Sequence, residues 1–259
     1  MILLIDNSNR TTKLALGSTA GVSEGWQCRL PSAGLVADVV VEAVRDWSVV
    51  ESVAFCSVTE AGPAVLRAVA ADRGLPCLGL TAACVPLDLS HYPEPATIGS
   101  DRLADAVAAA AIFPGRTVVA IDAGTAVTFN VVAPGRRHPV FLGGAIAPGL
   151  GVFSTWLHEA TDRLPAIEFP CDPPAPAIAD STVGAMRTAA WYGCAGMLNG
   201  LLASLCAGLD DPAIVITGSD AGLVRSLLAR PATRAPWLTL DGVRRTALAA
   251  EGPASVGQA

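Results

Sequence analysis

Two short segments of the chain each place an aspartate at the end of an apolar run and follow it with small polar residues. In the first segment, residues 1–16, the aspartate is Asp6. In the second segment, residues 117–132, it is Asp122, followed by a turn of sequence AGT. Such a turn places backbone N–H groups and small hydroxyls beside an acid, which suits a polyphosphate and its cation. The two segments therefore predict two β-hairpins that together hold a nucleotide.

The aspartates also have a purely structural interpretation, because strand-Asp-turn-strand is a common hairpin in which Asp only stabilises the turn. Two copies at matching places in the two halves of the chain favour the nucleotide interpretation and indicate an internal duplication. Lys13 is the only lysine and lies seven residues after Asp6, so it is a candidate phosphate ligand. The alternative is an ordinary solvated lysine. Leu14 follows Lys13, which excludes the Gly-Lys-Ser/Thr sequence of a P-loop.

A third candidate site is the turn at residues 99–102, of sequence GSDR, which leads into a predicted helix. Asp101 could act as a base for an alcohol, and Arg102 could hold an anionic end of the substrate through a bidentate contact. The structural alternative is that Asp101 only caps the helix.

Alternating strands and helices must position these residues, and the hydrophobic pattern predicts an α/β protein. The predicted strands beyond the two hairpins are residues 25–30, 52–56, 76–80, 139–146 and 213–217. The predicted helices are residues 33–47, 61–73, 101–113, 149–160, 181–207 and a last one that ends at 228. The helix at 101–113 is expected to bridge an N-terminal lobe, residues 1–110, and a C-terminal lobe, residues 111–250. Residues 251–259 are expected to form a disordered tail.

Composition excludes several classes of protein. A hydrophobic fraction of 52% with 15% charged residues is typical of a compact protein with a large core. The formal net charge of -6 and the lack of a clustered basic segment argue against a nucleic-acid partner. The apolar stretches are interrupted or too short to span a membrane, and no signal peptide precedes Asp6. The sequence thus predicts a cytoplasmic protein without a membrane partner.

Cysteine and histidine do not indicate a metal or disulfide framework. The seven Cys residues include no CxxC pair, and their odd number fits reduced, mostly buried thiols. His158-Glu159 begins like the zinc motif HExxH, but Asp162 stands where the second His is required. We therefore expect His158 to be a surface residue.

Taken in order, the candidate motifs resemble those of the type III pantothenate kinases, and they span Met1 to Gly196. The resemblance implies the fold of the actin-like, sugar-kinase superfamily. Its two duplicated α/β lobes, of ribonuclease-H-like type, have an ATP cleft between them. The motifs are Asp6-x-x-Asn9-x-x-x-Lys13, Gly99-x-Asp101-Arg102, Asp122-x-Gly124-Thr125-Ala126-x-Thr128, Gly143-Gly144-Ala145-Ile146-x-Pro148-Gly149, and Thr182 with Met186.

The resemblance implies an enzyme that uses ATP to phosphorylate pantothenate to 4′-phosphopantothenate, the first step of coenzyme A biosynthesis. Mg²⁺ would accompany ATP, Asp101 would accept the hydroxyl proton, and Asp122 would hold a monovalent cation, K⁺ or NH₄⁺. The implied ATP-binding residues are Asp6, Asn7, Ser8, Asn9, Arg10, Thr11, Thr12, Lys13 and Thr125. The implied pantothenate-binding residues are Tyr92, Gly99, Ser100, Asp101, Arg102 and Thr182.

The chain departs from the family's motifs at Ser8, where Gly is usual, at Arg10, where Ser or Thr is usual, and at Asp105, where Asn is usual. Glycine lets the backbone approach a phosphate closely, so Ser8 bears on ATP affinity. One alternative is a non-catalytic regulator that binds nucleotide or pantothenate, and another is a kinase for a different small alcohol. Retention of Asp101 and Asp122 favours an enzyme.

The resemblance and an apolar helix at residues 186–205 also predict the state of assembly. The helix carries more apolar surface than one packing partner requires. We expect a homodimer with the pantothenate pocket at or near the subunit interface, although a fully buried core helix would show the same composition.

Overall fold

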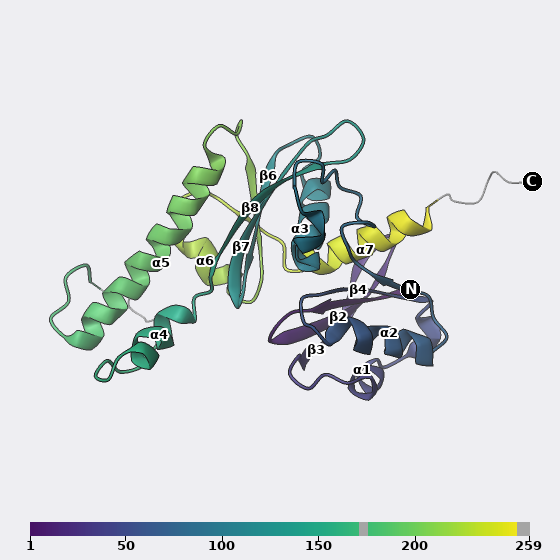
Figure 1. Cartoon of the computed structure of the whole chain (residues 1–259), viewed down its shortest axis with the longest axis horizontal. Coiled ribbons are helices and arrows are strands. Elements are labelled where there is room, and N and C mark those ends of the chain that lie inside the picture. The colour runs from purple at the N-terminus through teal and green to yellow at the C-terminus, as the bar shows by residue number, and fades with distance from the viewer. Residues whose placement is uncertain (171–175, 253–259) are drawn as a thin grey trace, which may run out of the picture. The chain divides into compact units, whose positions relative to one another are not determined.

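The computed structural model describes residues 1–170 and 176–252 (Figure 1). These residues form two compact units, each built around a five-stranded sheet. The first unit contains Met1–Gly115, Val132–Leu142 and the chain from Trp237 onward, and the second contains Arg116–Val131 and Gly143–Pro236. The predicted lobe boundaries at residues 110 and 250 stay a prediction. The division into units also shows that the chain returns to the first unit from Trp237 onward.

The sheet of the first unit has the strand order β3-β2-β1-β4-β5. The predicted hairpin is confirmed: β1 and β2 are antiparallel, with Asp6 directly opposite Lys13. β4 and β5 continue the sheet in parallel, as the predicted strand-helix-strand pattern requires. The strands are β1 (Ile2–Asn7), β2 (Thr11–Ser18), β3 (Gly21–Pro31), β4 (Ser52–Ser57) and β5 (Cys77–Gly79).

Four α-helices belong to the first unit: α1 (Ala37–Ala43), α2 (Gly62–Asp72), α3 (Ser100–Ile112) and α7 (Leu238–Glu251). Two short 3₁₀ turns, Trp47–Val49 and Pro95–Thr97, connect them. α1 is shorter than the predicted helix at 33–47, because its first residue has no side-chain cap and its middle is a run of valines with weak helix propensity. β1, β2, β4, α1 and α2 share one core of aliphatic and aromatic side chains, among them Leu3, Ile5, Leu14, Phe55 and Leu66.

α3 is buried around most of its circumference, unlike the amphipathic helix predicted for 101–113. Nine of its thirteen residues are buried. α7, which the sequence pattern did not predict, packs against it and has Gly242 where a Cβ atom would overlap the carbonyl oxygen of Ala104. The Thr239 hydroxyl of α7 donates a hydrogen bond to Asp105 Oδ1 at 2.8 Å. The unusual Asp105 is therefore part of the contact between these two helices.

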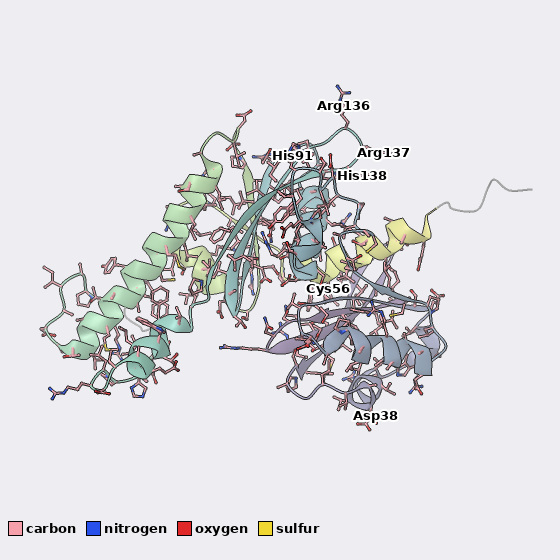
Figure 2. All side chains as sticks on the ribbon, in the orientation of Figure 1. Asp38, Cys56, His91, Arg136, Arg137 and His138 are labelled. Carbon is pink, nitrogen blue, oxygen red and sulfur yellow. The ribbon has the colours of Figure 1, made fainter. Side chains whose placement is uncertain are left out.

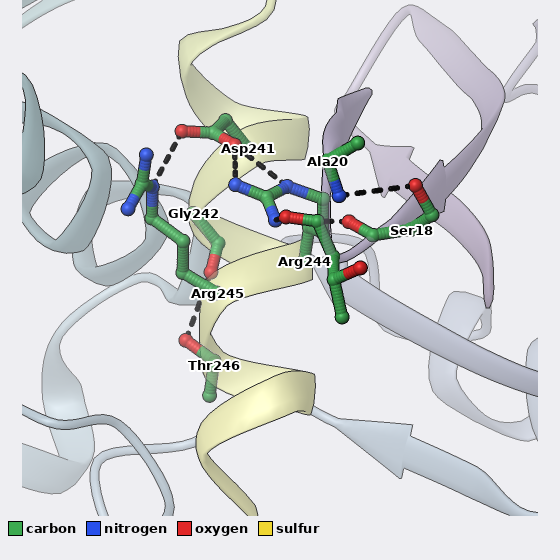
Figure 3. Close-up of polar contacts among 8 residues, drawn as sticks. Ser18, Ala20, Asp241, Gly242, Arg244, Arg245 and Thr246 are labelled. Carbon is green, nitrogen blue, oxygen red and sulfur yellow. Dashed lines mark hydrogen bonds and ion pairs between the residues drawn. The ribbon is translucent and has the colours of Figure 1, made fainter. Parts of the chain in front are cut away.

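A charged cluster connects α7 to the strand β2 (Figure 3). Asp241 accepts hydrogen bonds from Arg244 Nη2 and Arg245 Nε, both at 2.6 Å. Arg244 Nη1 donates to the backbone oxygen of Ser18 at 3.0 Å. Because Arg244 is almost completely buried, these bonds satisfy a charge that would otherwise be costly to bury.

The sheet of the second unit has the order β10-β9-β6-β7-β8, in which β6, β9 and β10 are parallel. When the strands of each unit are numbered from that unit's own first strand, both sheets have the order third-second-first-fourth-fifth. In the second unit this order runs from β8 to β10. The predicted duplication is thus confirmed at the level of topology, and with it the α/β fold of two similar lobes. The strands are β6 (Val118–Ala123), β7 (Ala126–Ala133), β8 (Val140–Pro148), β9 (Ala213–Thr217) and β10 (Thr233–Arg234).

Three helices accompany this sheet: α4 (Val152–Ala160), α5 (Thr182–Cys206) and α6 (Ala221–Leu227). α5 buries a single stripe of residues four apart: Met186, Ala190, Cys194, Leu198 and Leu202. Leu198 and Leu202 join the core formed with β6, β7 and β9. Within the described residues, α5 is the one helix whose length and composition would allow it to cross a membrane. A core helix of a soluble protein passes the same test, so a single such helix is weak support for a membrane span.

Two predictions fall partly outside the described residues. Of the predicted tail at 251–259, Glu251 ends α7 and residues 253–259 lie outside the described part. Residues 168–179 are too rich in proline for a regular helix and predict an ordered surface loop, of which residues 171–175 also lie outside the described part.

Candidate active site

Asp6 stands at the end of the central strand β1 and is only 2% exposed. Its Oδ2 accepts a hydrogen bond from Lys13 Nζ at 2.8 Å, and its Oδ1 accepts one from Ser8 Oγ at 2.9 Å. The thiol of Cys56 approaches the same Oδ1 at 3.7 Å. A buried carboxylate needs such partners, and the lysine gives it a charge-assisted one. The single lysine of the chain is therefore an ion-pair partner of Asp6 rather than an ordinary solvated residue.

The predicted ATP-binding residues of this hairpin occupy two different environments. Asn9 and Arg10 form the exposed tip of the turn, which is closed by a hydrogen bond from Ser8 N to Thr11 O at 3.2 Å. Asn7 and Thr12 are buried, and Asn7 Nδ2 donates to Thr12 Oγ1 at 2.7 Å. A phosphate can reach the tip, whereas the side chains of Asn7 and Thr12 face the interior of the unit.

Asp101 is the second residue of α3 and lies in its first turn, and Gly99 is the residue that precedes the helix. Its Oδ1 accepts a hydrogen bond from the backbone N of Arg102 at 2.7 Å. Burial raises the pKa of the Asp101 carboxyl, and the negative charge of Asp6 raises the pKa further, while the bond from Arg102 N opposes both. A carboxyl with a raised pKa is a better proton acceptor once ionised, as general-base catalysis requires.

Arg102 and Tyr92 both pack against the aromatic ring of Phe141. The guanidinium carbon of Arg102 lies 5.7 Å from the ring centroid of Phe141, and the ring of Tyr92 lies 5.9 Å from it at a tilt of 48°. Phe141 is fully buried at the start of β8, in a stretch that belongs to the first unit. The first unit thus brings two of the predicted pantothenate-binding residues together through a residue that the sequence did not single out.

A pocket of about 610 Å³ opens beside Gly99 and Ser100 within the first unit. Its wall is mainly apolar and includes Phe55, Leu80 and Ile98. One cation, Arg67, lies over the Phe55 ring at 5.6 Å from its centroid.

In the second unit, Asp122 is the fifth residue of β6 and is partly exposed. Gly218, with φ of 101°, approaches so closely that a Cβ atom there would collide with Asp122 Oδ1 and the carbonyl oxygen of Ala123. Gly149 donates its N–H to Thr125 O at 3.2 Å and leaves no room for a Cβ atom either. Gly149, which belongs to a predicted motif, and Gly218, which does not, therefore pack directly against backbone oxygens of the turn that follows Asp122.

Thr182 begins α5, where Ser181 caps the helix by accepting a hydrogen bond from Gly184 N at 3.2 Å. It belongs to the second unit, as do Asp122 and Thr125, while the other predicted site residues belong to the first. Their assembly into one site stays a prediction.

Two neighbours of the site went unpredicted. Cys56 lies in the interior of the first unit (Figure 2), where burial and the charge of Asp6 raise the pKa of its thiol well above its usual value. Ser57, the next residue, contacts both the Asp6 hairpin and α3. A single Cys or Ser has no local sequence pattern that would predict a place beside the site. Over residues 1–170 and 176–252, no group of three or more His, Cys, Asp or Glu residues is placed to hold a metal ion.

Comparison with known proteins adds independent information. The family model described as type III pantothenate kinase matches residues 2–204. A type III pantothenate kinase of Akkermansia muciniphila is 38% identical over 253 residues, which cover 93% of this chain and 96% of that protein. One from Methylacidiphilum infernorum is 42% identical over 164 residues, 62% of this chain and 58% of that protein.

Solved structures match over nearly the whole chain at low identity. A glucokinase of the ROK family from Streptomyces griseus, in complex with glucose and AMPPNP, has a TM-score of 0.53 and 16% identity and covers 97% of this chain and 99% of that one. A Campylobacter jejuni protein assigned to the Baf family of transcriptional activators has a TM-score of 0.59 and 16% identity, with coverage of 97% and 100%. At this identity the two structures support the fold alone.

Proposed function

The chain belongs to the type III pantothenate kinase family, and from this premise we propose how its own residues carry out the ATP-dependent phosphorylation of pantothenate. The product, 4′-phosphopantothenate, is the first intermediate of coenzyme A biosynthesis. Phosphoryl transfer asks a protein mainly for alignment of the reactants and neutralisation of charge. The roles proposed below divide these tasks among the two hairpins and the start of α3.

The observation that carries the proposal is the environment of Asp101. Its carboxylate lies in the first turn of α3, is held by the backbone of Arg102, and has a raised pKa because it is buried near Asp6. We propose that Asp101 accepts the proton of the pantothenate hydroxyl. As the hydroxyl oxygen attacks the γ-phosphorus of ATP, its proton moves to an Asp101 oxygen. The bond to ADP breaks as the new oxygen-phosphorus bond forms.

The first hairpin is proposed to contact the phosphates of ATP. Its exposed tip offers Asn9 and Arg10, and the guanidinium of Arg10 provides a fixed fork of donors for a phosphate. Lys13 balances the charge of Asp6 by their ion pair at 2.8 Å. The Ser8 hydroxyl is directed to Asp6, which leaves the backbone of the turn as the part that would approach a phosphate.

The second hairpin is proposed to hold the monovalent cation through Asp122. The oxygen ligands fit such an ion, because the carboxylate lies beside the backbone carbonyl oxygens of the turn. Gly149 and Gly218 pack against these oxygens. Bound there, K⁺ or NH₄⁺ would screen the negative charge of Asp122 from ATP. ATP carries a divalent metal in kinases, and Mg²⁺ would accompany it here. Thr125, exposed at the tip, is proposed as a nucleotide contact.

Pantothenate is proposed to bind along Gly99 to Arg102, with Tyr92 and Thr182. Arg102 would pair with the carboxylate of pantothenate, and its packing on Phe141 together with Tyr92 supports a fixed orientation. The apolar pocket beside Gly99 supports a substrate that has an apolar body.

We also propose a cytoplasmic homodimer with the pantothenate site at or near the subunit interface. Support comes from the second unit, where α5 buries only one stripe and leaves Val183 and Tyr192 exposed. Trp156 of α4 and Ile146 of β8 are exposed as well. A long helix that leaves large apolar side chains exposed supports a protein interface on that helix. A monomeric mass in solution at micromolar concentration would contradict the dimer.

One assay tests the activity directly. Purified protein is mixed with ATP, Mg²⁺, K⁺ and pantothenate, and phosphopantothenate is detected by mass spectrometry. We expect its formation to require both substrates. Binding of ATP or pantothenate without product would instead support the non-catalytic regulator.

A further inference from the structure

Asn7 follows Asp6 directly in the chain, and its side chain is entirely occupied by other protein groups. Its Oδ1 accepts hydrogen bonds from Ser57 Oγ at 2.7 Å and from Thr59 Oγ1 at 2.6 Å. Its Nδ2 donates to Thr12 Oγ1 at 2.7 Å and to Ser32 Oγ at 3.4 Å. An amide has two donor hydrogens and two acceptor lone pairs, so this set uses its whole capacity. Asn7 is 1% exposed, and its contacts are internal.

The Asn7 side chain is closely packed where it meets β4 and α2. Gly62, the first residue of α2, has no room for a Cβ atom against Asn7 Oδ1, Ser57 Oγ and Thr59 Oγ1. Its backbone N donates to Thr59 Oγ1 at 3.1 Å. The end of β1 is therefore fixed to the end of β4 by a packed and fully hydrogen-bonded cluster.

The end of β4 is in turn fixed to the start of α3. β5 ends at Gly79, opposite Phe55, and does not extend to Ser57. At Ser57 the hydroxyl of Ser100 makes the backbone hydrogen bonds that a neighbouring strand would otherwise make. Ser100 Oγ accepts a hydrogen bond from Ser57 N at 2.9 Å and donates one to Ser57 O at 3.0 Å. Ser100 is 9% exposed, so water competes little for these backbone groups.

The two ends of this chain of hydrogen bonds are next to the two carboxylates of the site: Asn7 adjoins Asp6, and Ser100 adjoins Asp101. We propose that Ser100 is a positioning residue, which through Ser57 and Asn7 sets the place of Asp101 relative to the Asp6 hairpin. This inference rests on the proposed kinase activity and on Asp101 as its base. It also gives Ser100 and Asn7 a role that does not require contact with pantothenate or ATP.

Ser100→Ala removes both bonds to Ser57 and leaves the charge of the site unchanged. We expect its kcat to fall about 10²-fold, the loss typical of a misplacement of about 1 Å, with KM for ATP and pantothenate within about twofold. Ser100→Thr keeps a hydroxyl and should recover most of the loss. Thr97→Ala is the matched control, because that hydroxyl bonds only to Glu94 O in the turn before α3, and its kcat should equal that of wild type.

The pH dependence of kcat separates positioning from a merely structural role. Asp101 is surrounded by the charge of Asp6 from β1, the thiol of Cys56 from β4 and the guanidinium of Arg102 from its own helix. If Ser100→Ala loosens the helix start, Asp101 becomes more exposed, and the fall of kcat at low pH should move to lower pH. A lower unfolding temperature with wild-type kcat and pH profile would overturn the proposal.

Thr59→Val provides a second route should Ser100→Ala not fold. It removes the hydrogen bond from Thr59 to Asn7 Oδ1 and the one from Gly62 N to Thr59, and leaves α3 unaltered. We expect a smaller fall in kcat, about tenfold, with KM unchanged. An unchanged kcat in Thr59→Val would contradict the proposal. An inactive wild-type enzyme would instead contradict the proposed function.

Discussion

The two hairpins share a sequence pattern and a place in equivalent sheets, yet they treat their carboxylates differently. In the first, Asp6 is buried, paired with Lys13 across the strands at 2.8 Å and held by Ser8. In the second, Asp122 is partly exposed and lies beside closely packed backbone oxygens. The first hairpin thus supplies a cation to its own carboxylate, whereas the second has oxygen ligands of the kind that we propose bind a cation from solution.

This difference indicates how a duplicated element can divide two tasks. A carboxylate neutralised by its own lysine can lie close to phosphates without strong repulsion. We propose that Asp122 reaches the same state by binding a monovalent cation from solution. We therefore expect the two hairpins to respond to different perturbations, one to mutation of the ion pair and the other to the composition of the buffer.

The largest effect should come from removing the monovalent cation. Replacing K⁺ by a large organic cation at constant ionic strength, with Mg²⁺ retained, should abolish turnover in the phosphopantothenate assay, because the cation proposed at Asp122 would no longer balance the negative charge of the ATP phosphates. Asp122→Asn should make the remaining turnover insensitive to K⁺. Unchanged turnover of the wild type in the organic salt would show that Asp122 has another role.

The ion pair of the first hairpin should matter for stability. Lys13→Met leaves Asp6, 2% exposed, without its cation, and should lower the free energy of unfolding by about 3 kcal/mol, the low end for breaking a buried pair. Urea unfolding measures the loss. Arg29→Met is the matched control, since Arg29 is an exposed cation opposite Lys13 on β3, and its effect should stay within about 0.5 kcal/mol.

Asp6→Asn in the Lys13→Met background should recover part of that stability, because it removes the unpaired charge. If Lys13→Met is as stable as Arg29→Met, the first hairpin does not depend on its ion pair, and the contrast between the hairpins is lost.

A smaller effect is expected at the tip of the first hairpin. Arg10→Thr should weaken ATP binding by about 1 to 3 kcal/mol, the range for a hydrogen bond to a charged group, as measured by titration calorimetry. The structure places Arg10 at the exposed tip, where its side chain is available to a phosphate. Tighter ATP binding by the variant would show that Arg10 obstructs the turn, and would favour a regulator over an enzyme.

Much of the fold follows from local pattern. The strand at Ala213–Thr217 was predicted to the residue, because a short run rich in β-branched residues is bounded by Pro212 and Gly218. α7 was missed because Thr239, Asp241, Arg244 and Thr246 interrupt its apolar pattern. Thr239 bonds to Asp105 of α3 and Arg244 to the backbone of β2, both far away in the sequence, whereas Asp241 and Thr246 bond within α7 itself.

The site was predictable where a residue type has a strong chemical preference. Asp6, Lys13 and Asp101 were singled out by charge and spacing; the structure pairs the first two with each other, and their roles toward ATP and pantothenate stay a prediction. Ser57 and the structural use of Asn7 and Ser100 were not foreseen. Most of their bonds join residues 25 to 52 positions apart, and hydroxyl and amide side chains have no periodic signature.

The most direct test of the kinase mechanism is turnover across the pH range for wild type and Asp101→Asn. Because burial raises the pKa of Asp101 and only the ionised form accepts a proton, wild-type turnover should fall as the pH drops through that raised pKa. The variant should remain folded, bind ATP and pantothenate, lose about 10²- to 10⁴-fold in turnover and lack this fall. Equal turnover and the same pH profile in both proteins would contradict the assignment of Asp101 as the base.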